Sequence, residues 1–250
     1  MTILLGLIGR TLGHSFSARY FADKFERECI DGRYALFEMP KIENLQNLLV
    51  WMPGLRGFNV TIPYKEEIIP FLSEISDDAR EIGAVNTVLV KDGKLIGYNT
   101  DWRGFRDSIL TLLPKDNQIG KALVLGSGGA AKAVVYALRS IGIRPTVVSR
   151  NPEAVDWAES VGYDSLDADA MEAHRLVVNA TPLGTWPNTE TCPPVPYGLL
   201  TPEHICADLV YNPSTTEFMR RSAEQGATTA NGYRMLVNQA ELSWQIWERP

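Results

Sequence analysis

A glycine-rich turn near the middle of the chain restricts its fold more than any other feature. The segment from Val124 to Ala131 reads VLGSGGAA, with a strand pattern before it and a helical pattern after it. Its spacing fits G-x-G-x-x-G/A, in which the first glycine makes a tight turn and the second lets the backbone approach a pyrophosphate. The N–H groups that open the next helix then face this anion. The sequence therefore predicts a dinucleotide site rather than a bare structural turn, held by Gly126, Ser127, Gly128, Gly129 and Ala130.

The end of the following predicted strand indicates which dinucleotide is bound. An NAD enzyme usually has Asp or Glu at this place, which holds the ribose 2′-OH. This chain has Ser149, Arg150 and Asn151 instead. An acid would repel a 2′-phosphate, whereas a guanidinium attracts it and can stack on adenine. We therefore expect NADP rather than NAD, the alternative being that Arg150 is a solvated loop charge.

Strand and helix patterns alternate along almost the whole chain, which predicts an α/β protein with mostly parallel sheets covered on both faces. Asp92-Gly93 indicates a hairpin turn. The pattern changes near Asp101, and the 250 residues are enough for two domains. We expect domains of residues 1–101 with 237–250 and of residues 102–236. The expected strands are 3–8, 34–39, 57–60, 84–90, 94–98, 121–125, 145–149, 176–179 and 205–209, and the expected helices are 17–29, 42–51, 65–71, 77–82, 102–113, 130–140, 154–161, 217–225 and 235–247.

Charge and composition exclude several classes of function. The net charge of -6 argues against nucleic acid as a partner, since a phosphate backbone calls for a basic face. The apolar runs are short, which argues against a membrane span, and residues 1–9 read as a strand rather than a signal peptide. Cys29, Cys192 and Cys206 are far apart, which suits a reducing cytoplasm. The scattered histidines and cysteines predict no metal site.

Four polar clusters follow predicted strands in the first 101 residues. They span residues 14–17, 59–65, 83–87 and 97–101. Each alone has a simple structural explanation, such as a serine that caps a helix or an Asn and a Thr that form a turn beside Pro63. Together with a nucleotide site they suit ketone reduction, which needs a hydride, a proton donor and groups that fix the substrate. Lys65 can supply the proton, and a nearby carboxylate such as Asp101 would orient it.

The motifs occur in the order typical of one family. They read HSFS at 14–17, NVTIPYK at 59–65, GAVNT at 83–87, NTD at 99–101, GSGGA at 126–130, NAT at 179–181, DLVYNP at 208–213 and NGYRML at 231–236, followed by Gln239. Over nearly its whole length the sequence resembles the shikimate dehydrogenase family. This resemblance implies an N-terminal substrate-binding domain, a Rossmann-type NADP-binding domain, and the reversible NADPH-dependent reduction of 3-dehydroshikimate to shikimate in the shikimate pathway of aromatic amino acid biosynthesis.

The resemblance also implies a role for each matching residue. Lys65 and Asp101 would be the catalytic pair, and Ser15 and Ser17 would bind the substrate carboxylate. The substrate ring and its hydroxyls would be held by Thr61, Asn86, Asp101, Tyr211 and Gln239. The cofactor would be held by residues 126–130, by Ser149, Arg150 and Asn151, and on the nicotinamide side by Asn179, Thr181, Leu209 and Gly232. The expected partners are the small-molecule substrate and NADP, and the protein is expected to be a monomer or a homodimer.

Some positions depart from the family pattern. Ala18 replaces a frequent proline, and Ala154 stands near the place of a basic residue, so that one contact to the 2′-phosphate is lost. Pro182 removes a backbone donor and Thr185 replaces an apolar Met beside the nicotinamide. Three alternatives stay open: a quinate/shikimate dehydrogenase with broader substrate or NAD use, a folate-type methylene dehydrogenase, and a non-catalytic nucleotide-binding sensor.

Overall fold

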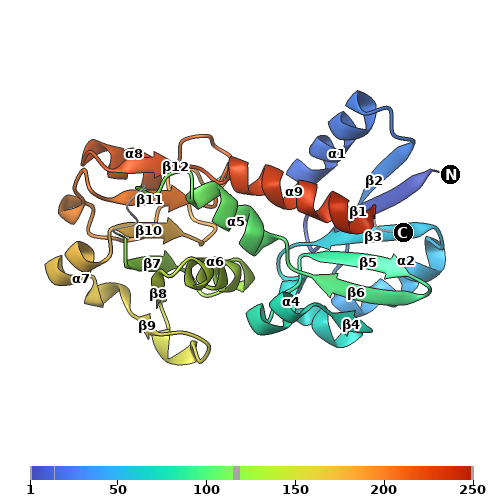
Figure 1. Ribbon diagram of the computed structural model, residues 1–250, viewed down its shortest axis with the longest axis horizontal. Coiled ribbons are helices and arrows are strands. Elements are labelled where there is room, and N and C mark those ends of the chain that lie inside the picture. Colours follow the sequence, from blue (N-terminus) through green and yellow to red (C-terminus); the bar gives the residue numbers. More distant parts are fainter. Residues whose placement is uncertain (1, 14, 115–118, 249–250) are drawn as a thin grey trace. The chain divides into compact units, whose positions relative to one another are not determined.

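The structure, a computed structural model, describes residues 2–13, 15–114 and 119–248. His14, the first residue of the HSFS motif, lies outside this range. The chain divides into two compact units, which we call the first unit (Met1–Thr100 with Gln239–Pro250) and the second unit (Asp101–Asn238). Both are of the expected α/β type (Figure 1). Among the described residues, no helix is both long and apolar enough to cross a bilayer.

The sheet of the first unit is mixed. Its strands lie in the order β2-β1-β3-β5-β6-β4, and the pairs of β1 with β2 and β3 are parallel, whereas β5 runs antiparallel to β3 and β6. The antiparallel part includes the β5–β6 hairpin that the sequence predicted at Asp92-Gly93. There, Asp92 and Gly93 take the two positive φ angles, 52° and 75°, that a two-residue hairpin turn requires. The strands are β1 (Ile3–Gly9), β2 (Gly32–Glu38), β3 (Leu55–Val60), β4 (Glu74–Ile75), β5 (Thr87–Lys91) and β6 (Lys94–Tyr98).

Helices cover both faces of this sheet. The described ones are α1 (Phe16–Arg27), α2 (Leu45–Trp51), α3 (Tyr64–Glu67), α4 (Asp77–Ile82) and the last turns of α9 (Tyr233–Trp247), with 3₁₀ turns at Ile42–Asn44 and Ile69–Phe71. One apolar cluster includes Ile8, Phe58 and Tyr64. A second cluster joins Phe21 of α1 to Trp247 of α9. The expectation that the last helix packs on the N-terminal part is confirmed by this second cluster.

The second unit contains a fully parallel sheet with the strand order β12-β11-β10-β7-β8-β9. Numbered within the unit, this order is 6-5-4-1-2-3, the doubly wound Rossmann arrangement, and it reverses between β7 and β10. The strands are β7 (Lys121–Leu125), β8 (Arg144–Val148), β9 (Ser160–Val161), β10 (Leu176–Asn179), β11 (Ile205–Asp208) and β12 (Thr228–Ala230). The helices are α5 (Asp101–Ile109), α6 (Gly129–Ser140), α7 (Ala168–Ala173), α8 (Glu217–Glu224) and the start of α9, with 3₁₀ turns at Pro152–Ala154, Tyr163–Ser165 and Tyr197–Leu199.

The helix expected over residues 154–161 is wrong. A 3₁₀ turn at Pro152–Ala154 is followed by extended chain and by β9. The carbonyls of Glu159 and Val161 accept hydrogen bonds from the backbone N–H groups of Val147 and Ser149 at 2.8 and 3.0 Å. Because β8 would otherwise leave these N–H groups unpaired, the demand for backbone hydrogen bonds outweighs the local helix preference.

Candidate active site

The glycine-rich turn meets two other predicted cofactor segments at the carboxyl end of the parallel sheet. Gly126 has φ +107°, and a Cβ at this position would lie 3.1 Å from Cγ2 of Thr181. Its N–H donates to the carbonyl of Val148, the residue before Ser149, at 2.8 Å. Only glycine takes this conformation without strain. The backbone therefore brings residues 126, 149 and 181 to one place.

The start of α6 fits a phosphate group. Gly128 is the N-cap of this 12-residue helix, and no side chain caps the helix there. Ser127 and Gly128 are exposed, and a Cβ built on Gly128 would meet nothing within 4 Å. The first N–H groups of a helix need acceptors, and their dipole favours an anion. Open space over Gly128 therefore allows a pyrophosphate to approach the backbone, and the residues present fit a dinucleotide cofactor.

The segment after β8 holds three residues of the predicted cofactor site. Ser149 is buried and its Oγ accepts from the N–H of Asn151 at 3.1 Å, which shapes the turn. Arg150 and Asn151 are exposed. Burial raises the pKa of Tyr163, and the nearby charge of Arg150 offsets part of this rise. The guanidinium of Arg150 is thus placed where it can meet an anionic ligand at the end of β8.

Asn179 and Asp208 form a buried polar centre at the ends of β10 and β11. The Asn179 Nδ2 donates to the Asp208 Oδ1 at 2.9 Å, and its Oδ1 accepts from the hydroxyl of Thr181 at 2.6 Å. The hydroxyl of Thr216 donates to the other carboxylate oxygen at 2.6 Å. Burial raises the pKa of Asp208 to about 6, although these hydrogen bonds oppose the rise. From the sequence, Asp208 was included in a motif but was assigned no role. The signal that could have identified it is an acidic residue at the end of an otherwise apolar strand.

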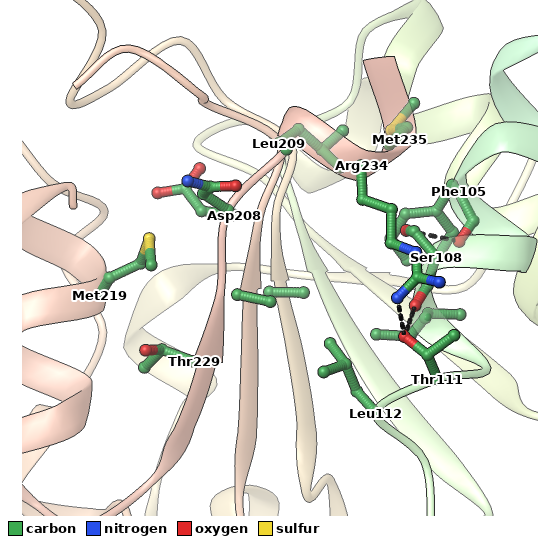
Figure 2. Close-up of a pocket in the computed structure, with 15 residues that line it drawn as sticks. Phe105, Ser108, Thr111, Leu112, Asp208, Leu209, Met219, Thr229, Arg234 and Met235 are labelled. Carbon is green, nitrogen blue, oxygen red and sulfur yellow. Dashed lines mark hydrogen bonds between the residues drawn. The ribbon is translucent and has the colours of Figure 1, made fainter. Parts of the chain in front are cut away.

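Leu209 and Gly232 border a cavity of about 390 Å³ in the second unit (Figure 2). A Cβ on Gly232 would lie only 2.1 Å from the carbonyl oxygen of Leu209, so any side chain there would displace the backbone. Figure 2 shows Arg234 reaching along the cavity towards Thr111, to whose hydroxyl it donates at 3.1 Å. The close approach of residues 209 and 232 therefore leaves no room for a side chain at position 232.

In the first unit, Asn86 is the centre of a second polar group. Its Oδ1 accepts from the backbone N–H of Thr100 at 2.7 Å, and its Nδ2 donates to the Thr100 hydroxyl at 2.9 Å. The same Nδ2 reaches the Oε1 of Gln239 at 3.4 Å. Two predicted substrate-binding residues, Asn86 and Gln239, therefore lie in contact although 153 positions separate them.

Four residues to which the sequence assigned no role are connected to this polar group by hydrogen bonds. Asn59 donates through Nδ2 to the hydroxyls of Thr87 and Ser243, at 3.1 and 3.0 Å. The Ser243 hydroxyl lies 3.2 Å from that of Thr100. Asn59, Thr87, Thr100 and Ser243 are all buried. Asn59, Thr87 and Thr100 lie at or next to the ends of apolar strands, which was the available signal, whereas Ser243 lies in α9 and only the fold shows that it meets them.

Ser15, Ser17 and Thr61 lie near the carboxyl ends of β1 and β3. Ser15 is the N-cap of α1, where its Oγ accepts from the N–H of Ala18 at 3.3 Å, and its own hydrogen can still be donated to an anion. Ser17 hydrogen-bonds Tyr34, and burial raises the pKa of this phenol far above its ordinary value. The N–H of Thr61 donates to the carbonyl of Ile8 at 3.0 Å. All three are half-buried.

The backbone of Lys65 is tied to the segment that precedes Asp101. Its carbonyl accepts from the N–H of Val85 at 2.7 Å, and the carbonyl of the neighbouring Ala84 accepts from the Asn99 side chain at 2.9 Å. Lys65 is half-buried, and Asp101, which opens α5, is 5% exposed. Tyr211 lies in the second unit, in the loop after β11. Among the described residues, no cluster of three or more His, Cys, Asp or Glu is suited to a metal ion.

Comparison with known proteins identifies the family. Residues 7–88 match the model of the shikimate dehydrogenase substrate binding domain. The chain is 37% identical to the shikimate dehydrogenase (NADP(+)) of Desulforamulus reducens, over 98% of this chain and 90% of the relative.

Solved structures agree with this relationship. The shikimate 5-dehydrogenase of Thermus thermophilus in complex with NADP(H) and shikimate superposes with a TM-score of 0.87 and 34% identity, over 98% of this chain and 93% of that one. The quinate dehydrogenase of Corynebacterium glutamicum in complex with NAD has a TM-score of 0.86 at 27% identity, over 99% and 94% of the two chains. With a relative of this identity along almost its entire length, the chain belongs to the shikimate dehydrogenase family.

Proposed function

We propose that the protein catalyses the reversible NADPH-dependent reduction of 3-dehydroshikimate to shikimate. The observation that carries this proposal is the full-length similarity to shikimate dehydrogenases, combined with two polar groups of the right chemistry. The first unit holds Asn86 and Gln239 in contact, with amides suited to ring hydroxyls. The second unit has an uncapped helix start beside an open glycine, suited to a pyrophosphate.

Lys65 is the proposed acid in the reduction. As the ketone carbon is reduced, negative charge develops on its oxygen, and the ammonium of Lys65 stabilises this charge and then gives up a proton to it. Asp101 is the proposed partner that orients this ammonium. In the oxidation of shikimate the neutral amine accepts the proton from the hydroxyl.

The substrate would be fixed by hydroxyl and amide groups. Ser15 and Ser17 donate hydroxyl hydrogens to the substrate carboxylate. Thr61, Asn86, Asp101, Tyr211 and Gln239 bind the ring and its hydroxyls. A polyhydroxylated acid needs several such partners, because each buried hydroxyl that finds none costs about 1–3 kcal/mol.

NADP would be held by the second unit, and when bound it supplies or accepts the hydride. The turn at residues 126–130 binds the pyrophosphate through backbone N–H groups. Arg150, with Ser149 and Asn151, faces the 2′-phosphate. Leu209 and Gly232, with Asn179 and Thr181, line the nicotinamide side. The close approach of Gly232 to Leu209 supports this assignment, because a bulkier residue at 232 would displace the backbone of Leu209.

Turnover of the purified protein tests the proposal. We expect NADP reduction with shikimate at a kcat/KM well above that with quinate, and a preference for NADP over NAD. A protein that prefers quinate or NAD would be a quinate/shikimate dehydrogenase. The observation that favours this second candidate is the similarity to the quinate dehydrogenase of Corynebacterium glutamicum, at 27% identity. Absence of turnover with both acids would contradict the proposal and favour a nucleotide-binding sensor.

We also propose a cytoplasmic location and a monomeric or homodimeric state. Cys29, Cys192 and Cys206 are all free in the structure. Three unpaired thiols suit a reducing compartment. Light scattering of the purified protein measures its mass in solution and decides between monomer and dimer.

A further inference from the structure

A partly buried cluster of polar side chains joins α1 to α9 within the first unit. Lys24 of α1 is only 4% exposed, and its Nζ donates to both carboxylate oxygens of Glu241 of α9, at 3.0 and 3.1 Å. The hydroxyl of Tyr20, one turn earlier in α1, donates to the same carboxylate. The Lys24 Nζ also donates to Glu28 at 3.0 Å, but Glu28 lies at the end of α1 itself. Glu241 therefore provides the bonds in this cluster that cross between the two helices.

The lysine in this cluster is charged. Burial by itself lowers the pKa of Lys24, but the hydrogen bonds to Glu28 and Glu241 outweigh it, and the net change is upward. The ring of Trp244 lies 5.6 Å from the Nζ and adds a favourable contact. A buried ammonium is costly unless it is paired, so loss of the Glu241 carboxylate weakens the connection between α1 and α9.

The two helices that this cluster joins also carry or adjoin proposed substrate-binding residues. The ring of Tyr20 stacks on Phe16, with 5.5 Å between the ring centroids, and Phe16 stands between Ser15 and Ser17 in the chain. On the other helix, Glu241 follows two residues after Gln239, which contacts Asn86. The residues that would bind the carboxylate and the ring hydroxyls thus belong to two helices, whose rotation and register the cluster fixes.

We infer that Glu241 is a positioning residue: through Tyr20 and Lys24 it fixes α1 against α9 and so sets the affinity of Ser15 and Ser17 for the substrate carboxylate. The inference rests on the proposed function. It names Glu241 as a determinant of recognition of the acid group, although this residue touches no substrate. A displacement of about 1 Å in groups that position a substrate can cost an enzyme up to about a hundredfold in rate.

The test compares two ligands that differ at the carboxylate alone, shikimate and shikimate methyl ester. Their dissociation constants are measured by calorimetry on the protein without nicotinamide cofactor. In Glu241→Ala we expect the affinity for shikimate to fall about tenfold and that for the ester much less, so that the preference for the acid shrinks. Glu241→Gln keeps the shape and an acceptor for Tyr20, and it should restore part of this preference.

Glu28→Ala is the matched control. It removes the same kind of side chain from the same lysine but leaves the link between the helices intact, and the preference for the acid should equal that of the wild type. Thermal unfolding followed by circular dichroism identifies the fraction of each variant that is folded.

An unchanged preference in folded Glu241→Ala and Glu241→Gln would overturn the inference and leave the proposed function standing. An equal loss in Glu28→Ala would overturn it too. A wild-type protein that does not bind shikimate would overturn both the inference and the proposed function.

Discussion

The phenol of Tyr34 donates a hydrogen bond to the side-chain oxygen of Asn59 at 2.7 Å. Tyr34 also hydrogen-bonds Ser17, one of the proposed carboxylate ligands. The amide of Asn59 reaches Ser243 and Thr87, which adjoin the group around Asn86. A continuous hydrogen-bonded network therefore connects Ser17 to Asn86 through the sheet of the first unit.

Replacement of Asn59 by alanine should destabilise the protein. It removes the hydrogen bonds that Tyr34, Thr87 and Ser243 make to the Asn59 side chain, and the loss of each costs about 0.5–1.5 kcal/mol. We expect the free energy of unfolding in urea to fall by about 2–3 kcal/mol. Asn44→Ala, at the exposed N-cap position of α2 where no side-chain cap bond forms, is a control that should change it little. Equal stability of Asn59→Ala and wild type would contradict the importance of the network.

Replacement of Lys65 by methionine should slow the chemical step. The methionine keeps the apolar stem but cannot donate a proton, so kcat with shikimate and NADP should fall by about 10²–10⁴-fold. The dissociation constant of shikimate, measured by calorimetry, should change much less. Lys94→Met removes an exposed lysine paired with Glu74 and should keep normal turnover. Near-normal kcat in Lys65→Met would refute the role of this residue.

Gly128→Ala should separate cofactor binding from stability. An added Cβ meets nothing within 4 Å in the protein but occupies the space over the start of α6. We expect an unchanged melting temperature and an affinity for NADP, measured by calorimetry, weakened about tenfold or more, since the pyrophosphate must approach this backbone. Gly162→Ala, another open glycine of the second unit, serves as the control. Undiminished NADP affinity in Gly128→Ala would place the pyrophosphate elsewhere.

Arg150→Gln tests the choice of cofactor. Hydrogen bonds to charged groups contribute about 1.5–3 kcal/mol, so NADP should bind about 10- to 100-fold more weakly, while the affinity for NAD stays the same. Arg144→Gln changes an exposed arginine at the opposite end of β8 and should leave both affinities intact. The two dissociation constants, compared by calorimetry at one fixed ionic strength, decide the matter. A parallel loss for NADP and NAD would assign Arg150 to the pyrophosphate instead.

Asp208 should make the stability of the protein depend on pH. Burial raises its pKa from 3.8 to about 6, so the folded state binds more protons than the unfolded state between these values. Stability from this group is therefore present below about pH 4 and is lost as the pH rises through about 6, a change of about 3 kcal/mol.

Asp208→Asn removes this titration. Its free energy of unfolding in urea, measured at several pH values between 4 and 7, should rise relative to the wild type as the pH increases. The hydroxyl of Thr216 can turn to accept from the new amide, so its hydrogen bond need not be lost. Asp164→Asn, at an exposed position, should follow the wild-type pH dependence. The same dependence in Asp208→Asn as in the wild type would show that Asp208 is not the group responsible.

Sequence patterns predicted the elements whose formation depends on local chemistry. The strand before Gly126, the helix after it and the hairpin at Asp92-Gly93 all appear where they were expected. Local patterns failed at residues 154–161, where the unpaired edge of β8 decides the conformation. They also missed α7 and β12, which are short and carry weak periodicity.

The sequence by itself determined the family, the class of fold and the identity of the chemical groups, because tight turns, helix starts and polar motifs depend on residue type and spacing. Only the tertiary structure decided that Asn86 lies against Gln239, that Asn59 supports both through Ser243, and that Lys24 is buried against Glu241. These partners lie far apart in the chain, and their contact depends on sheet order and helix packing, which no local pattern specifies.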